Sequence, residues 1–233
     1  MQIDPPSVIA AVTGAIHKAA QATGASFQYL LATAKVESNL NPNAAVSTTS
    51  AKGLYQFIGQ TWLATLKEHG PAHGYGPLAD AITRQPSGEY TVNDQRLYQQ
   101  IMNLRSDPQA NALMAGVFTK DNTAKLASTI GRNPTDGELY IAHFLGAGGA
   151  AQLINLTQTQ PNTRAADVFP RPASANRSIF YDRSGNARSV SDVYRVLVGR
   201  YDVARAAPSA AAVPQATTFR HRPRGSLRPT PHN

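Results

Sequence analysis

The residue best suited to acid–base chemistry is Glu37, one of only four glutamates in the 233-residue sequence. It lies near the end of residues 26–39, which have the apolar spacing of a helix, with Leu30 and Ala34 seven and three residues before it. This spacing puts the Glu37 carboxyl group on the apolar face of the helix. Burial favours the protonated form of a carboxyl group, and a proton donor that works near neutral pH needs that property. The pattern therefore predicts a general acid at position 37.

Polar and aromatic residues follow Glu37 at intervals that resemble a known family. They are Ser38, Asn41-Pro42, Ala44, Ser47, Gly53-Leu54-Tyr55-Gln56-Phe57 and Thr61-Trp62. This order is similar to the soluble lytic transglycosylase (SLT) family, in which Glu-Ser precedes Asn-Pro and then Gly-Leu-x-Gln. A later segment of that family, often Ala-Tyr-Asn-x-Gly, corresponds to Ala-His-Phe-Leu-Gly at residues 142–146, a variant that resembles an alphaproteobacterial branch. The resemblance implies a mainly α, lysozyme-like (goose-type or SLT-like) helical domain with an irregular or short β segment.

The resemblance also implies a reaction. In this family a single glutamate gives a proton to the β-1,4 link between N-acetylmuramic acid and N-acetylglucosamine. The 2-acetamido group of the substrate stabilises the cation, and the same glutamate then takes the proton of the C6 hydroxyl, which leaves a 1,6-anhydro ring. Most other glycosidases need a second carboxylate. The resemblance therefore implies that Glu37 acts alone, with no metal and no cofactor.

Substrate-binding roles follow from the resemblance as well. Ser38 and Ser47 would hydrogen-bond the acid or the acetamido group, and Gln56 would contact the sugar. Apolar floor for the sugar faces would come from Tyr55, Phe57 and Phe144. His143 would stand near the cleft, where the family usually has tyrosine. The family also places a late tyrosine near the acid, and Tyr194 fits that position best by its place in a helix, with Tyr181 second.

Other interpretations of the same residues stay open. A single glutamate on an apolar stripe is usually a helix-end residue whose carboxylate reaches water, and the aromatic residues taken singly are typical of a core. His143 could be a hydrogen-bonded core histidine. A hydrolytic muramidase could use Glu37 with a second carboxylate, for which the candidates are Glu68, Asp80 and Glu89. The altered residues 142–146 would also fit an inactive peptidoglycan-binding scaffold.

The remaining sequence predicts helices that would position these groups. Asp107-Pro108 is a helix start, Thr135 and Glu138 have the spacing of a capping box before a helix that closes at Gly146, and Ser191 can cap a last helix. Residues 43–58 read as a loop or a short β excursion, and residues 69–95 as a long loop of the kind that often forms a lid. We expect one lysozyme-like domain at residues 1–204 and a disordered Arg/Pro-rich tail at 205–233.

Composition limits the other function classes. The chain has no cysteine, which excludes disulfides and thiolate metal sites, and its histidines have no metal-ligand spacing with nearby acids. The net charge of +8 is mostly in the tail, because residues 1–204 hold 17 basic and 14 acidic side chains. We therefore expect no nucleic-acid binding by the folded part. No run approaches the roughly 18 apolar residues of a membrane span.

The expected partner is the glycan strand of peptidoglycan, bound by a monomer. The tail could dock on a protein of an envelope-spanning machine. The resemblance places the protein in the periplasm or cell envelope, although the first residues, Met1 to Val12, do not have the charge pattern of a signal peptide.

Overall fold

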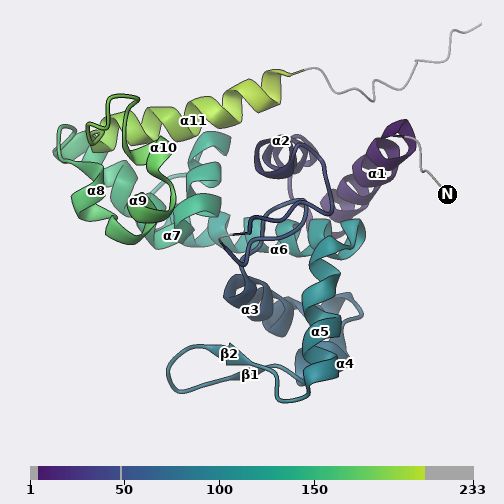
Figure 1. Ribbon diagram of the computed structural model, residues 1–233. Helices are drawn as coiled ribbons and strands as arrows, with labels where there is room; N and C mark the ends of the chain where they lie inside the picture. The colour runs from purple at the N-terminus through teal and green to yellow at the C-terminus, as the bar shows by residue number, and fades with distance from the viewer. Residues whose placement is uncertain (1–4, 48, 208–233) are drawn as a thin grey trace, which may run out of the picture.

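The computed structural model describes residues 5–47 and 49–207, and this part of the chain is mainly helical (Figure 1). The mainly α, lysozyme-like fold class predicted from the sequence is confirmed. The long and intermediate helices are α1 (Pro5–Thr23), α2 (Phe27–Ser38), α3 (Gly59–His69), α5 (Gln95–Asn103), α6 (Pro108–Ile130), α7 (Asp136–Thr159) and α11 (Val190–Ala206). Short helices are α4 (Gly76–Asp80), α8 (Ala165–Val168), α9 (Pro170–Ala175) and α10 (Arg177–Phe180), with 3-10 turns at Gly70–His73 and Leu104–Ser106.

Helix α6 runs through the middle of the molecule (Figure 1). It packs against α1 and α7, while α11 crosses over α7 and α2. Its start is as the sequence predicts: the Asp107 side chain accepts a hydrogen bond from the Ala110 amide at 2.8 Å, and Pro108 occupies the first turn. Gly131 ends the helix in the left-handed conformation (φ 72°). The central helix is therefore bounded by local signals at both ends.

Helices α7 and α11 depart from the predicted boundaries. The predicted capping box at Thr135 and Glu138 is present. Gly146 has non-helical backbone angles (φ 74°, ψ 162°) and kinks α7, but the helix resumes after it and continues to Thr159. The predicted helix end at Gly146 is therefore a kink and not an end. The cap of α11 is Ser189 and not Ser191, because Ser189 forms a capping box with Asp192 and the fully buried Val190 extends the helix.

The segment 69–95 is not the long loop that its composition suggests. It contains a 3-10 turn, helix α4 and a two-stranded antiparallel hairpin of β1 (Thr83–Arg84) and β2 (Tyr90–Thr91). Glycine, proline and histidine in this segment mark successive tight turns, which local composition does not distinguish from an open loop. Residues 43–58 fit the expected loop or β excursion, with isolated bridges between Ala45 and Lys52 and between Lys52 and Phe57.

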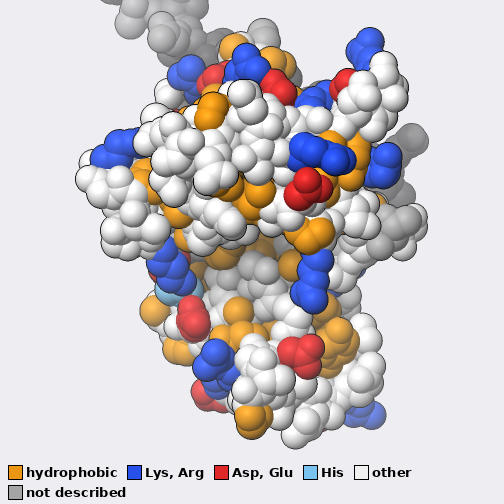
Figure 2. Space-filling model, turned by 90° about the vertical axis from the view of Figure 1, so that its left-hand side faces the viewer, with side chains coloured by type: hydrophobic (Ala, Val, Ile, Leu, Met, Phe, Trp, Pro, Cys, Tyr) orange, Lys and Arg blue, Asp and Glu red, His pale blue; other side chains and the backbone are white. Residues whose placement is uncertain are grey.

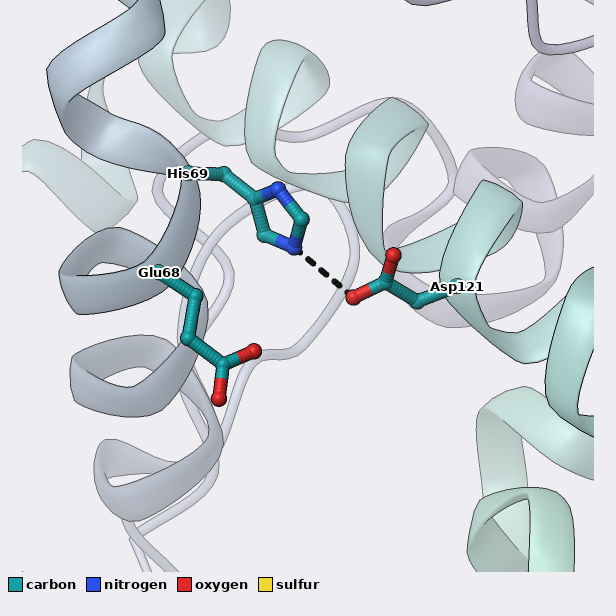
Figure 3. A group of neighbouring side chains, drawn as sticks. All are labelled: Glu68, His69 and Asp121. Atoms are coloured by element: carbon teal, nitrogen blue, oxygen red, sulfur yellow. Dashed lines mark hydrogen bonds and ion pairs between the residues drawn. The ribbon is translucent and has the colours of Figure 1, made fainter.

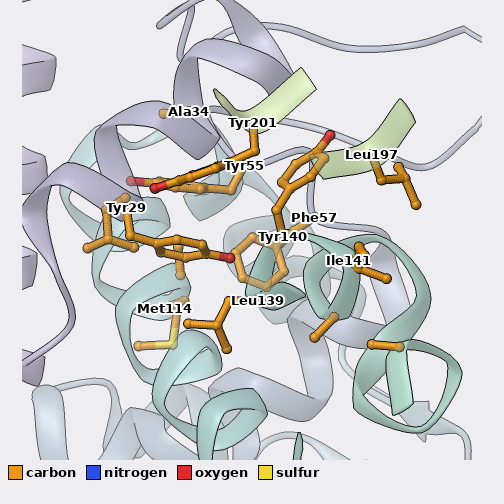
Figure 4. Packing of buried hydrophobic residues seen from close by; sticks show 14 of the residues in the cluster. Tyr29, Ala34, Tyr55, Phe57, Met114, Leu139, Tyr140, Ile141, Leu197 and Tyr201 are labelled. Atoms are coloured by element: carbon orange, nitrogen blue, oxygen red, sulfur yellow. The ribbon is translucent and has the colours of Figure 1, made fainter. Parts of the chain in front are cut away.

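The buried core is continuous through the domain. Trp62 is fully buried, and its indole N–H donates to the Ile101 carbonyl at 2.8 Å, which ties α3 to α5. A layer of tyrosines from α2, α7 and α11 (Tyr29, Tyr140 and Tyr201) packs beside Leu139 and Met114 (Figure 4). From this layer the Tyr140 hydroxyl reaches Glu37, in the last turn of α2.

The predicted tail lies almost wholly outside the described residues. Helix α11 continues to Ala206, so the first residues assigned to the tail are helical, and residues 208–233 are not described. None of the described helices is both long enough and apolar enough to cross a membrane.

The buried Glu138 makes the stability of the fold dependent on pH. Its side chain is 2% exposed, accepts two hydrogen bonds from Arg132 at 2.6 and 2.8 Å, and accepts one from the Thr135 amide at 2.8 Å. The hydrogen bonds from Arg132 lower the pKa of Glu138 below its ordinary value of 4.5. A lowered pKa means that this stabilisation is present above pH 4.5 and is lost as the pH falls through the folded-state value.

We therefore expect Glu138→Gln to lower the free energy of unfolding by about 2 kcal/mol at pH 7 and by clearly less at pH 3. Urea denaturation at both pH values measures the difference. The control is Asp202→Asn, which removes an exposed pair with Arg205 and should change stability by less than about 0.5 kcal/mol. An equal loss for Glu138→Gln at the two pH values would contradict the assignment.

Candidate active site

Glu37 lies in the last turn of α2. The Ser26 side chain caps the start of this helix by accepting from the Tyr29 amide, and the helix ends at Asn39, which is left-handed (φ 51°). Leu40 is left-handed as well (φ 62°), so the chain turns sharply away from the helix axis after Ser38. The turn leaves the Glu37 side chain at the edge of the core, 19% exposed. The carboxyl group is therefore neither fully buried nor surrounded by bulk water.

Glu37 opens into a groove of about 670 Å³. The groove is lined by Glu37, Val46, Thr49, Ala51, Tyr55, Gln56, Phe57, Ile58, Thr61, Phe118, His143, Phe144, Leu145, Gly146, Ala175 and Asn176. Figure 2 shows the molecule hollowed between an upper part, with α8–α10, and a lower part, with α3 and the hairpin; hydrophobic side chains lie on the floor of this hollow. Of the described residues that line the groove, Glu37 is the only one with a carboxyl group. This apolar wall with a single acid is the main chemical feature of the site.

One wall of the groove is an irregular loop, residues 50–57, held by two buried polar side chains. The Arg105 guanidinium donates to the carbonyls of Ser50 and Phe57. Asn111 accepts from the Tyr55 amide at 3.1 Å and donates to the Arg105 carbonyl at 2.9 Å. Burial lowers the pKa of Arg105, which still has backbone carbonyls as partners. These side chains therefore give the loop hydrogen bonds of the kind that neighbouring strands give to a strand in a sheet.

Gln56 stands at the tip of this loop in a left-handed conformation (φ 48°), which costs energy for a residue with a side chain. Its amide nitrogen donates to the carbonyls of Gly53 at 2.8 Å and Ala44 at 3.1 Å. Both amide hydrogens are then used within the protein. The carbonyl oxygen of the amide is the remaining hydrogen-bonding group, and it can only accept.

Tyr140 and His143 from α7 complete the surroundings of the acid. The Tyr140 hydroxyl donates to Glu37 Oε1 at 3.0 Å, and His143 Nε2 lies 3.9 Å from the same oxygen. The two residues are three apart on α7, so both point from one face of the helix. Burial, together with the nearby charge of Glu37, raises the pKa of Tyr140 well above its ordinary value. Tyr140 therefore stays protonated and remains a hydrogen-bond donor.

A buried tyrosine layer backs this arrangement. The Tyr140 ring stacks on Tyr201 with centroids 6.3 Å apart, and Tyr201 lies 5.7 Å from Tyr29. The Tyr201 hydroxyl donates to Asp136 at 3.0 Å, at the start of α7. This packing holds Tyr140 in one orientation toward Glu37, because each ring in the layer is confined by the next.

The structure brings together most of the residues predicted for the site. Tyr55, Gln56, Phe57, His143 and Phe144 line the same groove as Glu37. Tyr55 and Phe57 are nearly fully buried, so they form the base of the wall and not an exposed sugar platform.

The two predicted serines lie differently. The Ser38 hydroxyl is within hydrogen-bonding distance of the carbonyls of Ala34 (3.0 Å) and Leu54 (2.9 Å), so it joins α2 to the loop instead of contacting Glu37. Ser47 is exposed beside the groove-lining Val46. Their roles as substrate contacts remain predictions.

The sequence-based choice of the tyrosine near the acid is wrong. Tyr194 donates to Glu138 at 3.3 Å, and Tyr181 lies under the Arg177 guanidinium, 4.4 Å from its carbon; neither lines the groove. The tyrosine at the acid is Tyr140, which sequence reasoning missed. Its spacing of three residues before His143, on the same helical face, was the available signal.

A comparison with known families agrees with this geometry. Residues 14–81 match the family model of the transglycosylase SLT domain. The resemblance predicted from the sequence is thereby confirmed. The SLT match covers Glu37 and the loop to Phe57 and ends before α7, which carries Tyr140 and His143. This match suggests a transglycosylase-type function that acts on peptidoglycan.

A substitution at Gly53 tests how tightly the loop wall, residues 50–57, is held. It has φ +86°, and a Cβ atom there would lie 1.9 Å from the Arg105 carbonyl oxygen. We expect Gly53→Ala to lower the free energy of unfolding by more than about 3 kcal/mol, because backbone would have to move. Gly74→Ala is the matched control: its φ is +85°, nothing lies within 4 Å, and the cost should be about 1 kcal/mol. Equal costs in thermal or urea unfolding would show that the loop is loosely held.

Proposed function

We propose that the protein is a lytic transglycosylase that cleaves the β-1,4 link from N-acetylmuramic acid to N-acetylglucosamine in peptidoglycan, with Glu37 as the only catalytic carboxyl group. The observation that carries this proposal is the groove itself. Among the described residues that line it, Glu37 is the only acid; it is hydrogen-bonded by Tyr140, and the chain has an SLT match. The product would be a strand that ends in a 1,6-anhydro ring.

The proposed reaction uses Glu37 twice. In the first step the protonated carboxyl gives its proton to the glycosidic oxygen while positive charge develops on the sugar ring. The 2-acetamido oxygen of the substrate then bonds to the anomeric carbon. In the second step the C6 hydroxyl attacks that carbon, the acetamido group leaves, and the Glu37 carboxylate takes the hydroxyl proton. Protons and electrons balance without water, metal or cofactor.

Tyr140 and His143 serve this cycle by holding the acid. The Tyr140 hydroxyl occupies Oε1, so Oε2 is left to exchange the proton. A donor on Oε1 also stabilises the carboxylate that exists between the two steps. His143, whose side chain is 13% exposed in the groove wall, lies 3.9 Å from the same oxygen and limits the space in which the carboxyl group can move.

The rest of the groove suits an N-acetylated sugar. Phe118 and Phe144, which are partly exposed in the groove, give apolar surface for a sugar face. The free oxygen of the Gln56 amide can accept the N–H of an acetamido group. These contacts support glycan recognition. None of the groups that make them carries a charge that would act on the cation developing on the sugar ring.

A hydrolytic muramidase is the rival function, and it needs a second carboxylate or an equivalent base. The candidates Glu68, Asp80 and Glu89 are exposed and do not line the groove. This placement favours the single-carboxylate reaction. An inactive peptidoglycan-binding scaffold is the third possibility, and it would keep the groove without the chemistry.

Product analysis with Glu37→Gln separates these functions. We expect the wild-type protein to release muropeptides lighter by one water than muramidase products, and Glu37→Gln to lower the rate by at least about 1,000-fold, because the proton donor is lost. Glu89→Gln, an exposed glutamate of the hairpin segment, is the matched control and should keep wild-type activity. Hydrated products would support the muramidase, and release by Glu37→Gln at the wild-type rate would refute the mechanism.

Tyr140→Phe tests the positioning of the acid. We expect kcat to fall about 10- to 100-fold with KM little changed, because a hydrogen bond to a charged group contributes roughly 1.5–3 kcal/mol. Tyr194→Phe is the control, since its hydroxyl contacts Glu138 and not Glu37. A larger loss of kcat in Tyr194→Phe, at equal thermal stability, would restore the late tyrosine as the residue at the acid.

The proposed substrate places the activity in the periplasm or cell envelope. Docking of residues 205–233 on a protein partner stays a prediction, because residues 208–233 lie outside the described chain.

A further inference from the structure

A second group of metal-binding side chains lies away from the groove, where the end of α3 meets α6. Glu68 and His69 are the last two residues of α3, and Asp121 projects from α6 toward them (Figure 3). His69 Nε2 is 2.7 Å from Asp121 Oδ2. One ligand atom of each of the three residues lies within 4.8 Å of the other two.

The spacing of histidines along the sequence gives no sign of this convergence. Asp121 is 52 residues from His69 in the chain, so no local spacing reveals the pair. The chain is also poor in acids, with 14 aspartates and glutamates in 233 residues and a net charge of +8. With so few acids and only six histidines in the chain, a cluster of two carboxylates and one histidine is not expected from composition alone.

The His69–Asp121 pair by itself could be an ordinary ion pair that joins α3 to α6. Such an ion pair does not account for the position of Glu68 beside it. Glu68 is exposed, and among the ion pairs of the described residues none includes it. Its carboxylate nevertheless lies beside that of Asp121, and two carboxylates at this distance repel unless a cation lies between them.

We propose that Glu68, His69 and Asp121 bind one Zn²⁺ ion. One imidazole nitrogen with two carboxylate oxygens is a donor set that Zn²⁺ accepts, whereas Mg²⁺ and Ca²⁺ prefer oxygen ligands alone. Bond lengths of about 2.0–2.2 Å require the ligand atoms to lie roughly 3.3–3.5 Å apart in a tetrahedron. To reach this geometry, His69 Nε2 and Asp121 Oδ2 would move apart from their present 2.7 Å, and the exposed Glu68 carboxylate would move closer to them. Water would take the fourth position.

The ion would link two helices, α3 and α6, that contribute residues to the groove. Helix α3 contributes Thr61 to the groove lining, and α6 contributes Phe118, one turn before Asp121. A zinc ion that joins the end of α3 to α6 would therefore stiffen both helices without taking part in the chemistry at Glu37. The proposal does not depend on the function assigned to the groove.

Calorimetric titration of the tag-free full-length protein, stripped with EDTA and titrated with ZnCl₂, tests the site. We expect one ion per chain with micromolar affinity. Glu68→Gln should weaken binding by more than about 10-fold. His73→Ala, which removes a histidine four residues from His69 that is outside the cluster, is the matched control and should bind as wild type does.

Glu68→Gln also keeps the test independent of folding. Because Glu68 forms no ion pair among the described residues and its charge is repelled by Asp121, the metal-free variant should melt at or slightly above the wild-type temperature. Zinc at about 100 times its Kd should raise the melting temperature of wild type by roughly 5–10 °C, but not that of Glu68→Gln at the same concentration. Loss of the zinc effect in Glu68→Gln alone would support the site.

Three results would overturn the proposal: no saturable zinc binding by wild type, equal binding by wild type and Glu68→Gln, or loss of binding in His73→Ala instead. If Asp121→Asn lowers the melting temperature of the metal-free protein while zinc binding is absent throughout, the cluster is only an ion pair between α3 and α6.

Discussion

The groove depends on burying an irregular loop without leaving its backbone polar groups unpaired. Residues 50–57 pair with other backbone only at isolated positions: the Lys52 amide donates to the Phe57 carbonyl, and the Gly53 amide to the Ala44 carbonyl. Arg105, in the 3-10 turn Leu104–Ser106, and Asn111, near the start of α6, are both nearly inaccessible to solvent and supply further hydrogen bonds to the loop. An unpaired buried polar group costs about 1–3 kcal/mol, so the two side chains decide whether the loop can lie against the core at all. The close approach of Gly53 to the Arg105 carbonyl follows from this packing.

The acid is placed by a second long-range contact. Glu37 and Tyr140 are 103 residues apart, and their hydrogen bond joins the end of α2 to the first turns of α7. The tyrosine layer behind it fixes Tyr140, while the sharp turn after α2 keeps the carboxyl at the boundary between core and groove. An acid that gives and then recovers a proton needs both features: a defined orientation and access to substrate.

Much of the fold could be predicted because helix signals are local. Asp107-Pro108 and the Thr135–Glu138 box act within one turn of chain, and the structure contains both. Predictions failed where several weak local signals compete. Ser189 and Ser191 are both possible caps, and burial of Val190 decides between them. The turns of residues 69–95 look like a loop until α4 and the hairpin pack on the domain.

The sequence by itself determined the catalytic candidate, Glu37, and the chain of groove residues from Tyr55 to Phe57, because their order along one short segment carries the family resemblance. Tertiary structure alone decided which tyrosine meets the acid, and that Glu68 and His69 meet Asp121. The physical reason is the same in both cases. A hydrogen bond or a shared ligand site needs atoms a few ångströms apart, and helix packing, not sequence separation, sets those distances.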